Sequence, residues 1–164
     1  MPEPAADAGA AGARLREATA GDQDFLCRVY ASTRAEELAL TDWSEEQKAQ
    51  FCQMQFTAQD AHYREHYPTA QFSVIERQGV PAGRLFVDRW TREIRIMDIA
   101  LLPEHRNAGI GTLFLQALME EARADGKTLS IHVEKFNPAL RLYDRLGFRP
   151  REDKGVYLLM DWKA

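Results

Sequence analysis

Residues 101–111 read LLPEHRNAGIG, and the rest of the chain can be interpreted outward from them. The apolar run that ends at Pro103 is typical of a strand end, and the amphipathic pattern from Gly109 to Ala124 predicts a helix closed by Gly126. Because glycine has no side chain, backbone N–H groups at this turn can approach an anion closely. The helix N-terminus adds unpaired N–H groups and a favourable dipole. The turn therefore predicts a phosphate or pyrophosphate site, although a plain connection with packing glycines would show the same local pattern.

Upstream of this turn, helical periodicity gives way to extended periodicity. Capping patterns at Thr19–Asp22 and Ser44–Gln47 predict two helices, and Pro68 stops the second one near Tyr67. A short strand is expected before the first helix, at residues 15–18. Alternating apolar residues then predict three strands of an antiparallel meander, at residues 71–76, 82–88 and 93–102.

Downstream of the turn, the pattern predicts two more strands and one more helix. The strands are expected at residues 128–133 and 156–162, and the helix at 137–146, ended by Gly147. The charge-rich stretch 149–154 is interpreted as a solvated turn. Met1–Ala13 is rich in Ala, Pro and Gly and is interpreted as a flexible tail, which leaves residues 14–164 as a single domain.

Composition narrows the class of protein. The 164 residues include 28% charged residues and carry a net charge of −4, which disfavours nucleic acid as a partner. No apolar run is long enough to span a bilayer, and the segment before Arg14 lacks the pattern of a signal peptide. The two cysteines are not in a CxxC pair, so free thiols in a reducing compartment are expected. These features predict a cytoplasmic protein with no membrane partner.

The Gly-rich turn resembles the acetyl-CoA signature of the GNAT superfamily of N-acetyltransferases, written Arg/Gln-x-x-Gly-x-Gly/Ala. Arg106, Gly109 and Gly111 match every defined position. Three further blocks resemble the family in the same order: the opening at residues 15–22, the strand end at 101–105, and Asn137 with the YDRLGF run at 143–148. The resemblance covers about residues 14–162.

The resemblance implies an α/β fold of the α+β kind, the acyl-CoA N-acyltransferase fold. A mixed, mostly antiparallel central sheet with two splayed strands would be flanked by about four helices. The splayed strands would be Glu93–Leu102 and Thr128–Val133, and the pantetheine arm of acetyl-CoA would insert between them.

The resemblance also implies which residues hold acetyl-CoA. The pantetheine arm would pair with the backbone at Ile99, Leu101 and Leu102, and Asn137 would reach the cofactor with its side-chain amide. The pyrophosphate would lie on the backbone N–H groups of Arg106, Asn107, Ala108, Gly109, Ile110, Gly111 and Thr112.

Tyr143 is the candidate general acid, since a phenol near the sulfur can protonate the departing thiolate. Without the resemblance, Tyr143 would be interpreted as a packed aromatic residue. Glu93 and Asp98 are the candidate bases that would accept a proton from the amine, directly or through water. A regular strand would place these two carboxylates on opposite faces, whereas a bulge would change that. For each, an ordinary surface or ion-pair role is the alternative.

A second motif competes with this interpretation. Residues 62–66 spell HYREH, the H-x-x-E-H pattern of some zinc hydrolases. Pro68 ends the helix directly afterwards, and a third metal ligand is not evident. No metal site is therefore expected, and these residues are interpreted as surface or cleft residues.

The expected function is transfer of an acetyl group from acetyl-CoA to a primary amine, by direct attack in a ternary complex. The acceptor, a small molecule or a protein amino group, cannot be identified from the sequence. A non-catalytic acyl-CoA-binding regulator on the same fold is the alternative, which the intact Tyr143 argues against. A toxin that acetylates charged tRNA would need a basic acceptor face, which the acidic charge disfavours. The resemblance leaves a homodimer open.

Overall fold

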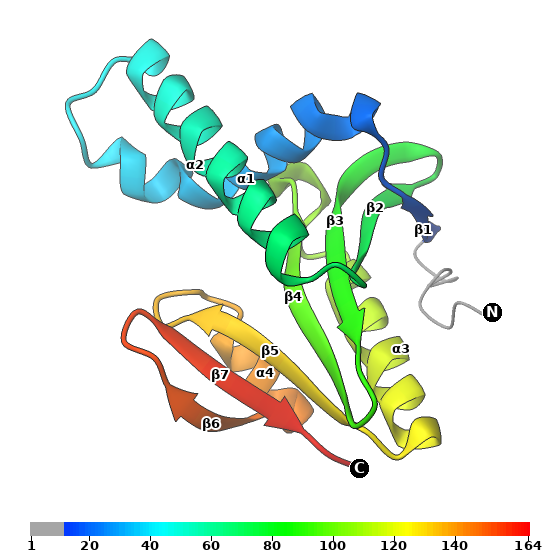
Figure 1. The fold of residues 1–164 in the computed structure, drawn as a ribbon. Coiled ribbons are helices and arrows are strands. Elements are labelled where there is room, and N and C mark those ends of the chain that lie inside the picture. The colour runs from blue at the N-terminus through cyan, green and yellow to red at the C-terminus, as the bar shows by residue number, and fades with distance from the viewer. Residues whose placement is uncertain (1–11) are drawn as a thin grey trace.

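A computed structural model describes residues 12–164 of the chain (Figure 1). Of the predicted tail, Met1–Ala13, the first 11 residues lie outside the part of the chain that the structure describes. Its last residue does not belong to a tail, because Ala13 begins strand β1 (Ala13–Glu17) and is buried. The strand therefore starts one residue before the predicted domain boundary.

Both predicted capping sites are present. The Asp22 carboxylate accepts the Thr19 N–H at 2.7 Å, and helix α1 (Gln23–Ala39) follows directly. Ser44 and Gln47 exchange side-chain-to-backbone hydrogen bonds of 3.1 and 2.8 Å at the start of α2 (Glu45–His66). These bonds satisfy N–H groups that the first turn of a helix leaves without partners.

Within the described residues, seven strands form one sheet in the order β1-β2-β3-β4-β5-β7-β6. Only β4 and β5 run parallel to each other, and the other neighbours are antiparallel. The remaining strands are β2 (Gln71–Arg77), β3 (Val80–Arg89), β4 (Glu93–Leu101), β5 (Thr128–Glu134), β6 (Arg149–Asp153) and β7 (Tyr157–Trp162).

Strand β6 corrects the interpretation of residues 149–154 as a turn. Its five residues are all exposed, and they pair with β7 at the edge of the sheet. An edge strand that is exposed on both faces shows no alternation of apolar and polar residues, so its sequence resembles a loop.

The parallel pair β4–β5 is short and then opens. It runs from Glu93 opposite Thr128 to Ile96 opposite Ile131, after which the two strands pair no further. On the other side of β4, Val87 faces Ile96 and Phe86 faces Asp98, so Met97 is an extra residue in a β-bulge. The mixed sheet with two splayed strands is thus confirmed, and Figure 1 shows β4 and β5 diverging upward from their paired ends.

Two apolar clusters hold the layers together. One packs α3 (Ile110–Asp125) and α4 (Leu140–Leu146) against one face of the sheet. The other packs α1 and α2 against the opposite face of β2, β3 and β4. The predicted count of about four helices is therefore confirmed. No helix within residues 12–164 combines the length and apolar character needed to cross a bilayer.

Candidate active site

The turn before α3 presents free backbone N–H groups to open space. Gly109 precedes the helix with a φ of +79°, in the left-handed region that favours glycine. The first N–H to donate within the helix is that of Leu113, to the Gly109 carbonyl at 3.0 Å. A methyl group added at Gly109 or Gly111 would meet nothing within 4 Å. The space beside these glycines is therefore clear, as an anion cradle requires.

The side chain of Arg106 points back toward the sheet. Its Nε donates to the Leu101 carbonyl at 3.0 Å, and its Nη2 lies 3.4 Å from the Ser32 hydroxyl of α1. Arg106 therefore braces the end of β4 against α1. At the same turn Asn107 has a φ of +62°, a conformation that asparagine tolerates better than most residues.

The end of β4 leaves only part of its backbone free. Ile99 and Leu101 are half-buried and Leu102 is buried. The Leu102 N–H already donates to the Ala82 carbonyl at 2.9 Å. The Leu102 carbonyl accepts the His105 N–H at 2.9 Å, so a cofactor could use only its second lone pair.

Asn137 is partly occupied by a local hydrogen bond. Its side-chain oxygen accepts the Ala139 N–H at 2.9 Å, which caps the turn that leads into α4. An amide oxygen used in this way leaves the NH₂ group as the part of the side chain that can donate to a ligand.

Tyr143 lies on α4 and is only 4% exposed. Its ring packs edge-on against Phe148 at 5.8 Å. Burial, with a contribution from the Asp98 carboxylate, raises the pKa of the Tyr143 phenol above its usual value. The phenol is therefore protonated at neutral pH, which a general acid requires.

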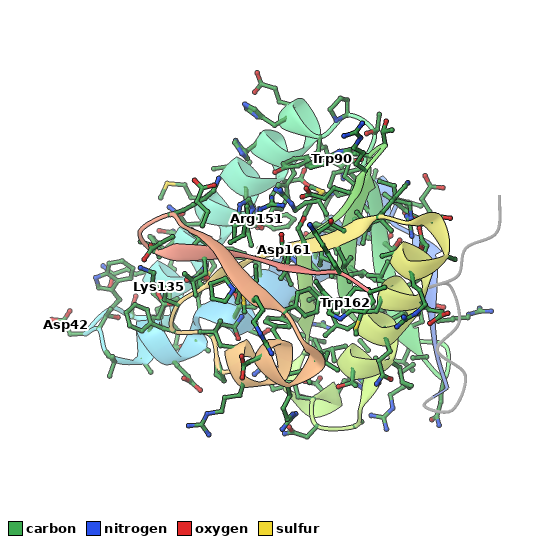
Figure 2. All side chains as sticks on the ribbon, turned by 90° about the horizontal axis from the view of Figure 1, so that it is seen from below. Asp42, Trp90, Lys135, Arg151, Asp161 and Trp162 are labelled. Atoms are coloured by element: carbon green, nitrogen blue, oxygen red, sulfur yellow. The ribbon has the colours of Figure 1, made fainter. Side chains whose placement is uncertain are left out.

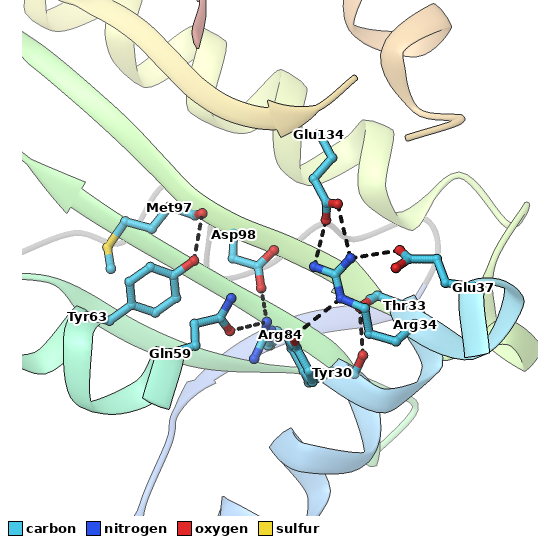
Figure 3. A network of polar contacts seen from close by, with 10 residues as sticks. All are labelled: Tyr30, Thr33, Arg34, Glu37, Gln59, Tyr63, Arg84, Met97, Asp98 and Glu134. Atoms are coloured by element: carbon cyan, nitrogen blue, oxygen red, sulfur yellow. Dashed lines mark hydrogen bonds and ion pairs between the residues drawn. The ribbon is translucent and has the colours of Figure 1, made fainter. Parts of the chain in front are cut away.

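Asp98 lies directly after the bulge and belongs to a polar network beneath α1 and α2 (Figure 3). It pairs with the guanidinium of Arg84, which is 2% exposed and also donates to Gln59 at 3.0 Å. The neighbouring Met97 carbonyl lies 3.5 Å from the Tyr63 hydroxyl. One end of the Asp98 carboxylate is therefore held from β3, and the group sits beside the bulged backbone.

Glu93 lies in a separate ionic cluster. Its carboxylate accepts from Ser130 at 2.5 Å, from Arg95 at 2.8 Å and from Arg151 at 3.2 Å. Burial works against ionisation, but the hydrogen bonds from Ser130, Arg151 and Arg95 outweigh it and lower the pKa of Glu93. Figure 2 shows Arg151 beside Asp161, its other partner at 3.3 Å. Glu93 is thus fully occupied by partners.

The bulge at Met97 brings the two carboxylates to one face of the sheet. Asp98 pairs with Phe86 of β3, and Arg95 pairs with Asp88. Because Phe86 and Asp88 are two residues apart on β3, they lie on one face of the sheet, and so do their partners Asp98 and Arg95. Glu93 is two residues from Arg95 and so lies on that face too. The bulge considered from the sequence is therefore present, although the two carboxylates have different partners.

A second arginine joins α1 to the free end of β5. Arg34 binds both oxygens of Glu134, at 2.8 and 3.0 Å, although the two residues are 100 positions apart (Figure 3). The same guanidinium lies 3.3 Å from the Tyr30 hydroxyl. A bidentate bond of this kind fixes geometry as well as charge, so it holds β5 at a set distance from α1 where the strands are splayed.

Sequence reasoning missed Arg84, Arg34 and His132 as members of the site. Arg84 could have been noticed as a lone charge inside the apolar strand AGRLFVD. His132 belongs to the alternation of Ser130, His132 and Glu134 with buried apolar residues on β5. The bond between Arg34 and Glu134 had no local signal, because it joins distant segments.

The zinc-like motif forms no metal site in the described part of the chain. The rings of His62 and His66 stack at 4.2 Å, and His66 Nδ1 lies 3.0 Å from the His62 carbonyl. Among residues 12–164, no group of three or more His, Cys, Asp or Glu side chains gathers in a way that could hold an ion.

A protein-family model matches residues 33–148, and its description is Acetyltransferase (GNAT) family. The chain is 35% identical over 95 residues to the "Putative ribosomal protein bS18-alanine N-acetyltransferase" of Bacillus subtilis, covering 56% of this chain and 63% of that protein. It is 32% identical over 87 residues to the mouse "Cysteine-rich protein 2-binding protein", covering 52% of this chain and 11% of that one. The match thus spans less than two thirds of each of these curated relatives.

Solved structures show the same fold. A PaiA N-acetyltransferase from Thermoplasma acidophilum, in complex with coenzyme A, has a TM-score of 0.70 at 16% identity, over 93% of this chain and 99% of that chain. The YncA protein from Salmonella typhimurium, with its cofactor acetyl-CoA, has a TM-score of 0.57 at 21% identity, over 93% and 94% of the two chains. At these identities the likeness establishes the architecture.

Proposed function

The chain belongs to the GNAT family of acetyltransferases, and on this premise we propose that it transfers an acetyl group from acetyl-CoA to a primary amine by direct attack in a ternary complex. The observation that carries the proposal is the splaying of β4 and β5, whose pairing ends at Ile96 and Ile131, together with the clear space at Gly109 and Gly111 in the turn that follows β4. A helix N-terminus with free N–H groups and clear space suits an anionic group of a ligand.

The backbone from Arg106 to Thr112 would hold the pyrophosphate of acetyl-CoA. The free N–H groups of the first turn of α3 and the helix dipole favour negative charge there. Ile99, Leu101 and the carbonyl of Leu102 would line the pantetheine arm, and the free NH₂ group of Asn137 would donate to it. Two of these backbone groups already have a partner in the fold: the Leu102 carbonyl accepts the His105 N–H at 2.9 Å, and the Arg106 N–H donates to the Pro103 carbonyl at 3.2 Å.

Tyr143 would act as the general acid. The acetyl carbon forms a bond to the amine nitrogen, its bond to sulfur breaks, and the departing thiolate takes the phenolic proton. The phenol keeps that proton at neutral pH, as an ordinary tyrosine does, and burial and the nearby Asp98 carboxylate raise its pKa further.

We assign the proton acceptor to Asp98 rather than Glu93. Asp98 lies beside the bulge where β4 leaves β5, and its charge acts on the Tyr143 phenol. Its side chain is 25% exposed, so an amine can reach it. The Glu93 carboxylate, in contrast, is occupied by three donors. In this proposal Glu93 joins β4 to β5 and β6 at the closed end of the gap.

The test is an acceptor screen. The purified protein would be incubated with acetyl-CoA and a panel of amines that includes small metabolites and peptides with free α- and ε-amino groups. Mass spectrometry would report acetylated product, and a thiol reagent would report free CoA. We expect a product that depends on Tyr143. Binding of acetyl-CoA without product from any amine would favour the non-catalytic regulator instead.

Two further properties stay proposals. We place the protein in the cytoplasm, which cell fractionation would test. A homodimer, which family resemblance leaves open, would be tested by light scattering at several protein concentrations.

A further inference from the structure

His132 lies on the same face of the sheet as Asp98. Its neighbours on β5, Ile131 and Val133, are buried in the cluster beneath α3 and α4, so His132 lies on the opposite face. Glu134 shares that face and binds Arg34 of α1. The imidazole therefore points to the side of the sheet where the polar network of Asp98 lies.

His132 also lies at the point where the gap begins. Ile131 is the last residue of β5 that pairs with β4, opposite Ile96, and His132 is the next residue. On the other strand, the next residues are Met97 and Asp98. His132 and Asp98 therefore stand on the two splayed strands, directly beyond the last level at which the strands pair.

The thioester of a bound acetyl-CoA would reach this same level. The proposed pyrophosphate cradle lies in the turn after β4, on the side of Ile96 where β4 and β5 no longer pair. The pantetheine arm must therefore enter at the wide end and extend toward the closed end. Tyr143, the proposed acid, belongs to the same region, because the Asp98 carboxylate adds to the effect of burial in raising the pKa of its phenol.

The imidazole of His132 has a free nitrogen there. Its Nε2 is buried and has no hydrogen-bond partner among the described residues. Burial and the positive charges of Arg95, Lys154 and Arg151 lower the pKa of His132 to about 4, although the negative charge of Glu152 opposes them. A neutral imidazole has one nitrogen that accepts a hydrogen bond, and a buried polar atom without a partner is costly unless a ligand supplies one.

We propose that His132 and Asp98 accept the two N–H bonds of a primary amine from opposite sides of the gap, so that the site selects primary over secondary amines. The inference rests on the proposed acetyl transfer. An attacking amine directs its lone pair at the carbonyl carbon and keeps two N–H bonds. Asp98 takes one proton as the C–N bond forms and the C–S bond breaks, and the thiolate takes the proton of Tyr143. His132 orients the second N–H and keeps it bonded in the product amide.

The test compares two amines that differ by one N-methyl group. For an acceptor found in the screen, kcat/KM would be measured for the primary amine and its N-methyl analogue. In His132→Leu, we expect the preference for the primary amine to fall about 10-fold. The leucine side chain cannot accept a hydrogen bond from the second N–H, and it can pack against the N-methyl group instead. In His132→Gln, which offers an amide oxygen, most of the preference should remain.

Two controls separate the possible failures. His66→Gln removes an exposed histidine on α2 and should leave both rates unchanged. Acetyl-CoA affinity, measured by calorimetry, should be the same in all these proteins. If wild type acetylates no amine, the proposed function fails. If wild type is active but His132→Leu keeps its preference, or if His132→Gln loses as much as His132→Leu, the role of His132 is overturned.

A second measurement does not depend on turnover or on the leucine variant folding. In wild type with bound CoA, the imidazole nitrogens of His132 can be followed by NMR. Addition of the primary amine should shift the Nε2 signal, and addition of the corresponding quaternary ammonium ion, which has no N–H, should not. Equal shifts with both ligands, or none with either, would contradict a hydrogen bond from the acceptor.

Discussion

At the scale of single residues, Arg84 gives the Asp98 carboxylate a structural role beside the catalytic role proposed for it. The guanidinium is buried between the rings of Tyr30 and Phe86, at 5.9 and 5.0 Å. Its charge is balanced by Asp98. Removal of one partner of a buried ion pair leaves an uncompensated charge, which costs more than the pair itself contributes.

Asp98→Asn should therefore destabilise the protein by about 3 kcal/mol, measured by urea unfolding, in addition to lowering activity. The double variant Asp98→Asn with Arg84→Met should recover part of the lost stability, because it also removes the stranded charge. If the double variant lost as much stability as Asp98→Asn and Arg84→Met lose singly when added together, the pair would not be coupled. Activity of Asp98→Asn must be measured well below its melting temperature.

Tyr143→Phe should lower kcat by about 10²-fold or more while acetyl-CoA binding stays almost intact. The substitution keeps the ring and its packing against Phe148 but removes the acidic proton. Steady-state rates with an identified acceptor, calorimetric binding and a melting curve would check this. A wild-type kcat, under conditions where chemistry limits the rate, would leave Tyr143 as a packing residue only.

The ion pair of Asp22 should make the free energy of unfolding depend on pH in the acidic range. The bidentate bond from Arg16 is the main reason that the pKa of Asp22 is well below its usual value. A lowered folded-state pKa stabilises the protein above the unfolded pKa of about 3.9 and loses that effect as pH falls. Asp22→Asn should therefore cost about 2 kcal/mol at pH 7, and urea unfolding should show the difference shrinking below pH 4. A difference that persists unchanged at pH 2 would rule out the ion pair as its cause.

At the scale of elements, a substitution at the start of α3 should affect the stability of the fold and the affinity for CoA differently. Gly111 lies in the first turn of the helix, where a methyl group would meet no other atom of the protein. Gly111→Ala should therefore leave stability unchanged or raise it by at most about 1 kcal/mol. The same methyl group would occupy the space needed for the pyrophosphate, so affinity for CoA should fall, as calorimetry would show. Undiminished affinity would mean that the phosphates bind elsewhere.

Elements with local signals were predictable from the sequence. The cap at Ser44 and the break at Pro68 predicted a helix close to the observed α2, Glu45–His66. The glycine turns at Gly126 and Gly147 correctly marked the ends of α3 and α4, and both have positive φ angles. In each case the interactions that set the boundary lie within one turn of the residue concerned.

Features that depend on a distant partner were not predictable in the same way. Strand β6 is defined by its pairing with β7, since its own residues are all exposed. The bulge at Met97 could be considered but not located, because it is a mismatch of register with β3. The bond from Arg34 to Glu134 and the free nitrogen of His132 both needed the arrangement of α1 and β5 in space.

At the scale of the whole molecule, the sheet has two parts joined along a short seam. Strands β1–β4 form one part and β5–β7 the other, and four residue pairs connect β4 to β5, from Glu93–Thr128 to Ile96–Ile131. Beyond the seam, the Arg34–Glu134 bond ties β5 to α1. A ligand that lies in the gap would touch both parts, so its binding should oppose their separation during unfolding.

Acetyl-CoA should therefore stabilise the domain as a unit. A ligand that binds only the folded state at 100 times its Kd contributes about 2.7 kcal/mol, which for a domain of this size raises Tm by about 5–11 °C. Each further tenfold increase in ligand should add about 1.4 kcal/mol. Melting curves over a ligand titration would measure this, with Gly111→Ala as the matched control that shifts less at equal concentration. A Tm that stays constant up to millimolar acetyl-CoA would mean that the gap between β4 and β5 does not hold the cofactor, since binding to the folded state alone must raise it.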